Sequence, residues 1–108
     1  MFAERSSYAF DVTSYHSEPF LTNRRLFAMA DSGIPDGIKF DTHGNVYSGC
    51  GDGVNVWSPG GVLLGRIVLE GGAANFCFGY RGELFILNEY RLWRAQLSEN
   101  VRGALLGI

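Results

Sequence analysis

The sequence has few of the features that would tie it to a highly charged partner or to a membrane. Its 108 residues carry a formal net charge of only -2, which gives no electrostatic footprint for nucleic acid or an anionic membrane surface. No segment approaches the roughly 18 consecutive apolar residues of a membrane span, and no basic segment with an apolar run opens the sequence. We therefore expect no nucleic-acid and no membrane partner. The default expectation is a cytoplasmic protein, with a secreted one as the alternative if the sequence is a fragment of a longer precursor.

Cysteine and helical periodicity are also scarce. Cys50 and Cys77 are too few for a disulfide framework and lack a CxxC motif or histidine spacing that would indicate zinc. We expect both to be buried free thiols. No apolar period near 3.6 residues persists, so no helix is predicted. His16 and His43 have no GxSxG or triad context that would make either a catalytic base, and we expect them in exposed loops.

Glycine is abundant instead, with 15 glycines against 3 prolines, and this composition is typical of a globular all-β chain with many tight turns. Short apolar or alternating segments lie between these turns and predict strands. The predicted strands are 8–12, 20–28, 38–40, 46–50, 54–57, 62–69, 75–78, 83–87, 92–97 and a last short strand near the end. The first two are expected to form a hairpin with a long polar connection at 13–19.

An internal repeat organises these strands. The segment 40–47 matches 78–85 at four positions, a separation of 38 residues, and 61–65 matches 103–107 at a separation of 42. A repeating unit of about 40 residues with four short strands is typical of a β-propeller blade. The sequence therefore predicts β-propeller blades made of four-stranded antiparallel sheets.

The predicted blades are too few to close a ring. Residues 1–108 are expected to form a partial β-propeller: a half blade at 8–28, a blade at 34–69 and a blade at 74–108. Closed propellers need roughly four to eight blades, and an isolated piece would expose two apolar blade faces. Either the chain is the final part of a longer propeller whose N-terminal part is missing, or copies assemble. We expect a homo-oligomer that completes a propeller.

Three segments resemble a known family: PDGIKFDTHGNVY at 35–47, GVNVWSPGGVLLGRI at 53–67 and NFCFG at 75–79. Together they are similar to the C-terminal part of the gluconolactonase, SMP-30 and luciferin-regenerating family, with the fungal lactonohydrolase branch nearest. The resemblance covers about 8–108. It implies a six-bladed propeller that holds a divalent metal ion, often Ca²⁺, at the top of its central channel and hydrolyses lactones.

Asp36, in the Pro-Asp-Gly turn, is the first candidate site residue. The resemblance implies that its carboxylate is a metal ligand, and it would also be the catalytic base that accepts a proton from water. From the residues alone, Asp36 also suits a turn, where Asp side chains accept backbone N–H groups. A hard cation such as Ca²⁺ takes six to eight oxygen ligands, so Asp36 alone cannot hold one.

Four further residues are candidate substrate-binding groups. Asn75 begins the inner strand of the next blade, while Asp52, Asn88 and Glu89 lie in loops that fall on the same face of a propeller. Each also has a plain alternative, which is a solvated loop side chain or, for Asn75, an edge residue that satisfies backbone groups.

Two functions remain open from the sequence. The resemblance implies a metal-dependent lactone hydrolase, a carboxylic ester hydrolase with a small-molecule lactone as substrate, provided that the propeller is completed. The family's other metal ligands lie in earlier blades that this chain lacks. The alternative is a catalytically incomplete propeller fragment that assembles with itself or binds a partner chain.

Overall fold

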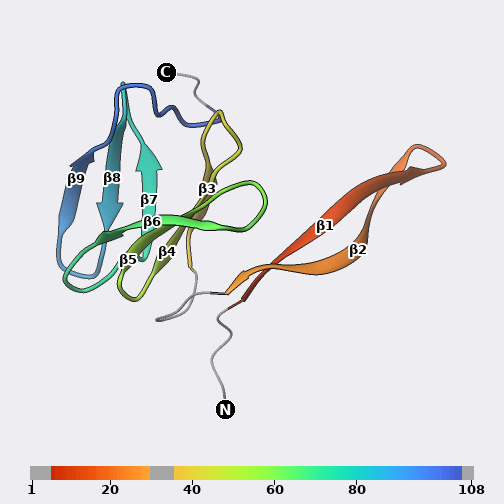
Figure 1. The fold of residues 1–108 in the computed structure, drawn as a ribbon, viewed down its shortest axis with the longest axis horizontal. Helices are drawn as coiled ribbons and strands as arrows, with labels where there is room; N and C mark the ends of the chain where they lie inside the picture. The colour runs from red at the N-terminus through yellow and green to blue at the C-terminus, as the bar shows by residue number, and fades with distance from the viewer. Residues whose placement is uncertain (1–5, 30–35, 106–108) are drawn as a thin grey trace, which may run out of the picture.

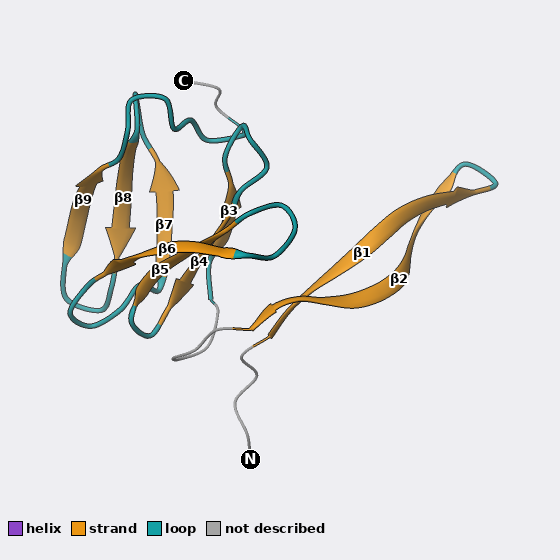
Figure 2. Cartoon of the chain, in the orientation of Figure 1, coloured by secondary structure: helices purple, strands orange, loops and turns teal. Residues whose placement is uncertain are grey.

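The computed structural model describes residues 6–29 and 36–105, which form nine strands in three antiparallel sheets (Figures 1 and 2). A hairpin is followed by a four-stranded sheet and a three-stranded sheet. The strands are β1 (Ser6–Tyr15), β2 (Glu18–Met29), β3 (Ile38–Phe40), β4 (Val46–Cys50), β5 (Gly53–Trp57), β6 (Leu63–Val68), β7 (Asn75–Phe78), β8 (Glu83–Leu87) and β9 (Leu92–Gln96). The described residues form no helix, hence none that could cross a bilayer. The predicted all-β fold of antiparallel, blade-like sheets is confirmed.

The β1–β2 hairpin is longer, and its turn tighter, than the sequence predicted. Tyr15 pairs directly with Glu18, and the two turn residues His16 and Ser17 have positive φ angles of 49° and 66°. Such a two-residue turn matches the twist of the flanking strands and lets the ladder continue to its tip. The expected long connection at 13–19 is therefore wrong. In Figure 1 the hairpin projects away from the other two sheets.

The two inner strands of the four-stranded sheet β3–β4–β5–β6, β4 and β5, are buried on both faces, whereas β3 and β6 are mostly exposed. On one face, Tyr47 and Val54 pack against the second sheet. On the other face, Val46, Cys50 and Trp57 form a cluster with Ala28, which lies at the base of the hairpin. The residues of β4 are buried without exception, as expected for an inner strand covered on both sides.

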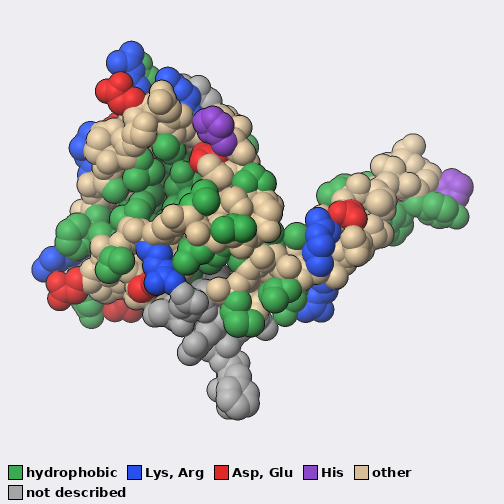
Figure 3. Space-filling view, viewed as in Figure 1, with side chains coloured by type: hydrophobic (Ala, Val, Ile, Leu, Met, Phe, Trp, Pro, Cys, Tyr) green, Lys and Arg blue, Asp and Glu red, His purple; other side chains and the backbone are tan. Residues whose placement is uncertain are grey.

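The three-stranded sheet β7–β8–β9 is buried on one face only. Its inner face carries Phe76, Phe78, Leu84 and Ile86, all at most 8% exposed, and these meet the first sheet in one core cluster. In Figure 3 hydrophobic side chains gather in the hollow between the two sheets. Cys77 lies between two inward-facing phenylalanines, so strand alternation turns it outward and leaves it exposed. The expectation of two buried thiols is correct for Cys50 and wrong for Cys77.

The chain after β9 does not form the expected last short strand within the described residues. It crosses to the end of β3, where Thr42 N–H donates to Arg102 O (2.8 Å) and Ala104 N–H donates to Phe40 O (2.9 Å). Gly103 makes an isolated bridge with Asp41. A Cβ at Gly103 would lie 2.8 Å from the Cβ of Phe78, so only glycine permits this close passage. Residues 106 and 107 of the repeat lie outside the described part of the chain.

Candidate functional site

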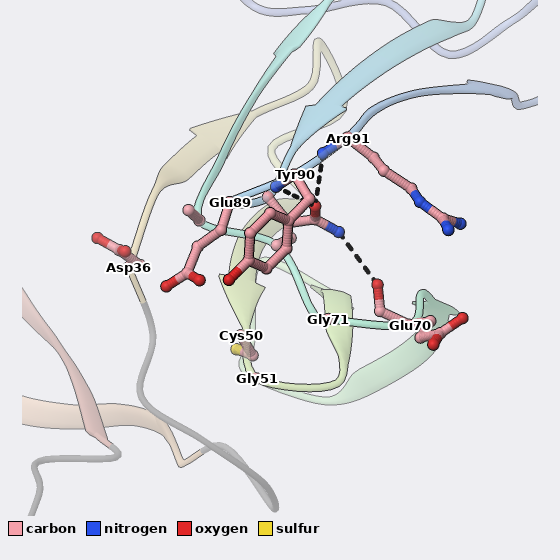
Figure 4. A pocket seen from close by; sticks show the side chains of 11 residues that line it. Asp36, Cys50, Gly51, Glu70, Gly71, Glu89, Tyr90 and Arg91 are labelled. Atoms are coloured by element: carbon pink, nitrogen blue, oxygen red, sulfur yellow. Dashed lines mark hydrogen bonds between the residues drawn. The ribbon is translucent and has the colours of Figure 1, made fainter.

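A pocket of about 820 Å³ lies between the start of β3, the link from β6 to β7 and the β8–β9 turn (Figure 4). Asp36, Asn88 and Glu89, three of the five predicted site residues, contribute to its wall. The complete lining is Asp36, Cys50, Gly51, Glu70, Gly71, Ala73, Ala74, Asn88, Glu89, Tyr90 and Arg91. These segments are separated by up to about half of the chain, and the packing of the two sheets brings them together.

Backbone hydrogen bonds hold the turn that carries Asp36. Asp36 N–H donates to Gly49 O (2.7 Å), Gly49 N–H donates to Gly37 O (2.8 Å), and Gly37 N–H donates to Ala74 O (3.2 Å). The start of β3 is thereby tied both to β4 and to the segment that leads into β7. The side chain of Asp36 is exposed at the edge of the pocket. Pro35, which precedes it, lies outside the described residues.

Asn88 joins the two loops on the far side of the pocket. Its Nδ2 donates to Glu70 O (3.0 Å) and Gly72 O (3.4 Å), while its Oδ1 accepts from the N–H groups of Tyr90 (3.2 Å) and Arg91 (3.0 Å). One amide therefore satisfies four backbone groups from two loops. Asn88 lines the pocket, but its amide nitrogen and oxygen already bond to backbone groups of the chain.

Charged and aromatic side chains of the β8–β9 turn stand at the pocket mouth. Figure 4 shows the carboxylate of Glu89 on the side nearer Asp36, and the guanidinium of Arg91 on the opposite side. Tyr90 is 89% exposed. The guanidinium of Arg91 also lies 5.6 Å from the ring centroid of Trp93, within the range of a cation–π contact. The mouth thus offers acceptors on one side and a cationic donor on the other.

Cys50 reaches the pocket lining from β4. Burial raises the pKa of the Cys50 thiol above its ordinary value, so the sulfur stays protonated at neutral pH. A protonated thiol is a poor nucleophile, and Cys50 therefore contributes to the pocket as a small apolar group.

The other two predicted residues, Asn75 and Asp52, do not line this pocket. The Oδ1 of Asn75 accepts from Phe76 N–H (2.9 Å), and a Cβ on Gly37 would lie 2.7 Å from that oxygen. Asn75 thus borders the Asp36 turn from the second sheet. The Oδ2 of Asp52 lies 3.9 Å from Arg66 Nε, while its Oδ1 is buried without a hydrogen-bond partner.

The oxygen ligands in the described residues do not make a complete Ca²⁺ site. Within 6–29 and 36–105 no group of three or more His, Cys, Asp or Glu side chains is arranged to hold a metal ion. Ca²⁺ takes six to eight oxygens, and Asp36 supplies one carboxylate. A cation at Asp36 would need further ligands from outside these residues.

Asp41 is the carboxylate whose importance the sequence reasoning missed. It is only 3% exposed and accepts hydrogen bonds from His43 N–H (2.9 Å), Asn45 N–H (3.0 Å), Asn45 Nδ2 (2.9 Å) and the Tyr47 hydroxyl (3.0 Å). Burial alone would raise the pKa of Asp41, but these hydrogen bonds outweigh it and hold the pKa below its usual value. Asp41 closes the β3–β4 turn, at the opposite end of β3 from Asp36. The spacing D-x-x-G-N-x-Y was the signal that could have identified it.

Tyr47 connects this turn to the hydrophobic core, because it bonds Asp41 and belongs to the core cluster. The Tyr47 ring meets the Phe78 ring edge to face, with centroids 4.9 Å apart and planes at 80°. The Asp41 network therefore also orients the contact between the two sheets, whereas the equivalent turn of the second sheet has Gly79 in place of the aspartate. Both predicted loop histidines, His16 and His43, are exposed as expected.

No family model matches the chain. Over 96 residues it is 36% identical to the lactonohydrolase oryH of Aspergillus oryzae, an alignment that covers 87% of this chain and 20% of that protein. It is 30% identical over 105 residues to a gluconolactonase of Zymomonas mobilis, which covers 87% of this chain and 30% of the relative.

Two solved structures have a similar fold. A candidate gluconolactonase matches with a TM-score of 0.77 and 26% identity, over 92% of this chain and 33% of the other. A gluconolactonase of Xanthomonas campestris, described as important in secondary glucose metabolism, matches with a TM-score of 0.68 and 32% identity, over 93% and 30%. The chain thus spans a fifth to a third of the length of these proteins. The resemblance to gluconolactonases and lactonohydrolases predicted from the sequence is confirmed over most of the chain.

Proposed function

We propose, from this likeness to gluconolactonases and lactonohydrolases, that the chain forms part of a lactone hydrolase with its substrate site at the pocket around Asp36 and Glu89. The observation that carries the proposal is the similarity in sequence and in fold over about nine-tenths of the chain. The pocket supports it, because the turn with the family's Pro-Asp-Gly pattern opens onto it. The activity belongs to the complete propeller to which this chain would contribute.

The proposed reaction is hydrolysis of a cyclic ester. A water oxygen bonds to the carbonyl carbon, the bond from that carbon to the ring oxygen breaks, and a hydroxy acid is released. Asp36 accepts the proton that the attacking water loses, as a general base. Glu89 accepts hydrogen bonds from hydroxyl groups of the substrate, and Tyr90 and Arg91 donate to its oxygens.

A divalent cation, Ca²⁺ in the first instance, is part of the proposal as a ligand of Asp36. Such an ion polarises a carbonyl and lowers the pKa of a bound water. The described residues do not supply its whole coordination shell, so the roles assigned above to the side chains do not depend on it.

The activity is tested by acid release from gluconolactone in a pH-stat, with the uncatalysed rate subtracted. We expect Asp36→Asn to lower kcat/KM at least about 100-fold, because general-base catalysis typically contributes 10²–10⁴-fold. Glu89→Gln should chiefly raise KM. Glu99→Gln, an exposed carboxylate outside this pocket, is the matched control and should change neither constant. A wild-type rate equal to the uncatalysed one, or full activity in Asp36→Asn, would overturn the proposal.

The cation is tested separately by thermal unfolding. A ligand that binds only the folded state stabilises it by about 2.7 kcal/mol at 100 times its Kd. Millimolar Ca²⁺ should therefore raise the Tm of the wild type and leave that of Asp36→Asn unchanged. An equal rise in both, or no rise in either, would contradict a role of Asp36 as a ligand.

A further inference from the structure

The β8–β9 turn at 88–91 carries three of the polar side chains at the pocket. Glu89, Tyr90 and Arg91 all line it and are all exposed. Side chains with this much exposure have few packing contacts to orient them. Their position at the pocket therefore depends on how the backbone of the turn is held.

The oxygen of the Asn88 amide orders the turn from within. It accepts from the N–H groups of Tyr90 (3.2 Å) and Arg91 (3.0 Å), the local pattern that makes asparagine common in turns. A backbone bond from Asn88 N–H to Arg91 O (3.1 Å) closes the same turn. The strand connection therefore persists without the side chain, while the orientation of the two N–H groups depends on it.

The nitrogen of the same amide holds the turn to the link between β6 and β7. Nδ2 donates to Glu70 O (3.0 Å) and Gly72 O (3.4 Å), and a dashed line in Figure 4 marks the bond to Glu70. Gly71, which has a φ of 84°, lies between these two acceptors, and a Cβ there would lie 3.1 Å from Nδ2. A glycine at this position lets the link approach the amide closely.

Asp36, the proposed catalytic base, is positioned without this amide. Its turn is joined to β4 and to the segment that leads into β7 by backbone bonds that involve Gly49, Gly37 and Ala74, and none of these bonds uses the side chain of Asn88. Loss of the amide should therefore displace the β8–β9 turn and leave the base in place.

We propose that Asn88 is a positioning residue for substrate binding, whose amide fixes the β8–β9 turn against the β6–β7 link and so sets the width of the pocket between these loops. Both loops contribute to the lining. The two amide hydrogens and the two lone pairs of the amide oxygen are already used by four backbone groups, so Asn88 acts on the substrate through the turn and not by contact. The inference rests on the proposed function, because the ligand is the lactone substrate.

Asn88→Ala tests this role in the acid-release assay with gluconolactone. We expect KM to rise about 5- to 10-fold, the factor that an ordinary hydrogen bond contributes to an equilibrium. The kcat should stay within about twofold of the wild type, because the base keeps its place. Asn45→Ala is the matched control: it removes an amide that bonds Asp41 (2.9 Å) in a turn outside the pocket lining, and both constants should stay unchanged.

Asn88→Asp separates the two ends of the amide. Its carboxylate still accepts from the N–H groups of Tyr90 and Arg91, but it cannot donate to Glu70 O or Gly72 O. Hydrogen exchange of the two N–H groups should therefore stay slow, while KM rises about as far as in Asn88→Ala. A wild-type KM in Asn88→Asp would show that the bonds to the β6–β7 link do not set the pocket, which contradicts the proposal.

Gly71→Ala disturbs the same contact from the opposite loop, because the new Cβ would press on the Asn88 nitrogen. It should raise KM by itself and add nothing to the rise in Asn88→Ala, since the two changes act on one contact. Gly44→Ala is its matched control: Gly44 has a similar φ of 81°, and its Cβ would lie 3.3 Å from Pro59 Cγ, outside the pocket lining. Its KM should equal that of the wild type.

The outcomes separate this role from the proposed function. An active wild type whose KM does not change in Asn88→Ala, or a variant that loses kcat alone, overturns the positioning role and leaves the lactone hydrolase in place. A KM rise in either control as well, or additive effects of Asn88→Ala and Gly71→Ala, also contradicts it. A wild-type rate equal to the uncatalysed one overturns the proposed function and this inference together.

Discussion

The Asp41 network makes the sharpest prediction about stability. Asp41→Ala removes the acceptor of four hydrogen bonds at a position that is 3% exposed. The donors that remain are two backbone N–H groups, the Asn45 amide and the hydroxyl of Tyr47, which is itself buried. Because buried donors without a partner lose their hydration and gain nothing in return, we expect a large loss of stability.

The size of that loss follows from the number and kind of bonds. A hydrogen bond to a charged group contributes about 1.5–3 kcal/mol net, and removing one partner of a buried charged network costs about 3–5 kcal/mol. The four bonds share one carboxylate, and the cost of burying its charge offsets part of their stabilisation. Their contributions to the free energy of unfolding are therefore not additive. We therefore expect Asp41→Ala to lower the free energy of unfolding by about 3–5 kcal/mol, a large part of the 5–15 kcal/mol of an ordinary domain.

Urea unfolding followed by tryptophan fluorescence measures this loss. Tyr47→Phe is the matched control, because it removes one of the four bonds and keeps the ring, and it should cost about 1–2 kcal/mol. Asp41→Asn still accepts the two backbone bonds and should fall between the two. All comparisons are made at one protein concentration, because self-association would shift the apparent stability.

The pH dependence of the free energy of unfolding provides a second test of the Asp41 network. The pKa of Asp41 in the folded chain is below its usual value, so its stabilising contribution is complete above the ordinary aspartate pKa of about 4 and is lost as the pH falls through the folded pKa. The difference between wild type and Asp41→Ala should be constant from about pH 5 to 8 and shrink below about pH 4. A loss under about 1 kcal/mol at pH 7, or a difference that grows in acid, would refute the reasoning.

Three further predictions concern the loops and the thiols. Gly72→Ala should cost about 2 kcal/mol or more in urea unfolding, because Gly72 has φ of 70° and its Cβ would lie 2.6 Å from a backbone oxygen, whereas Gly65→Ala, with no atom within 4 Å of the new Cβ, should be nearly neutral. Asn88→Ala should lower the free energy of unfolding by about 1–3 kcal/mol and speed hydrogen exchange in the turn that follows it, because its side chain bonds four backbone groups of two loops. Unchanged exchange would contradict this role of the Asn88 amide. Cys77 should react with a thiol reagent at once and Cys50 only on unfolding. Equal reaction rates of the two thiols would contradict the burial of Cys50.

Much of the local structure was predictable because strand period and turn chemistry are short-range properties. The bounds of β7 and β8, and those of β3 and β4, agree with the predicted ranges. The alternation of apolar and polar residues and the glycines in the turns suffice to predict these strands. The hairpin turn was missed because His16-Ser17 is not one of the glycine pairs that mark two-residue turns, although both residues adopt the required positive φ.

The candidate site was only partly accessible to the same reasoning. The Asp36 turn was found from its pattern, and loop position placed Asn88 and Glu89 near it. Asn88 makes its contacts with residues 16 and 18 positions earlier in the chain, and sequence spacing carries no information about such pairs. Asp52 was assigned to the same rim, yet it is not part of the pocket lining and its carboxylate lies beside Arg66.

By itself the sequence determined an all-β chain of short strands, its turn glycines and the carboxylate turn at Asp36, because each depends on residues within a few positions of one another. Only the tertiary structure decided which surfaces are covered. The segment at 102–104 pairs with the end of β3 and not with β9, because Gly103 can pass against Phe78. Sheet packing also left Val12 and Leu21 of the hairpin and Leu87 and Leu92 of the second sheet exposed. Contacts between distant segments depend on shape and volume, which the order of residues does not display.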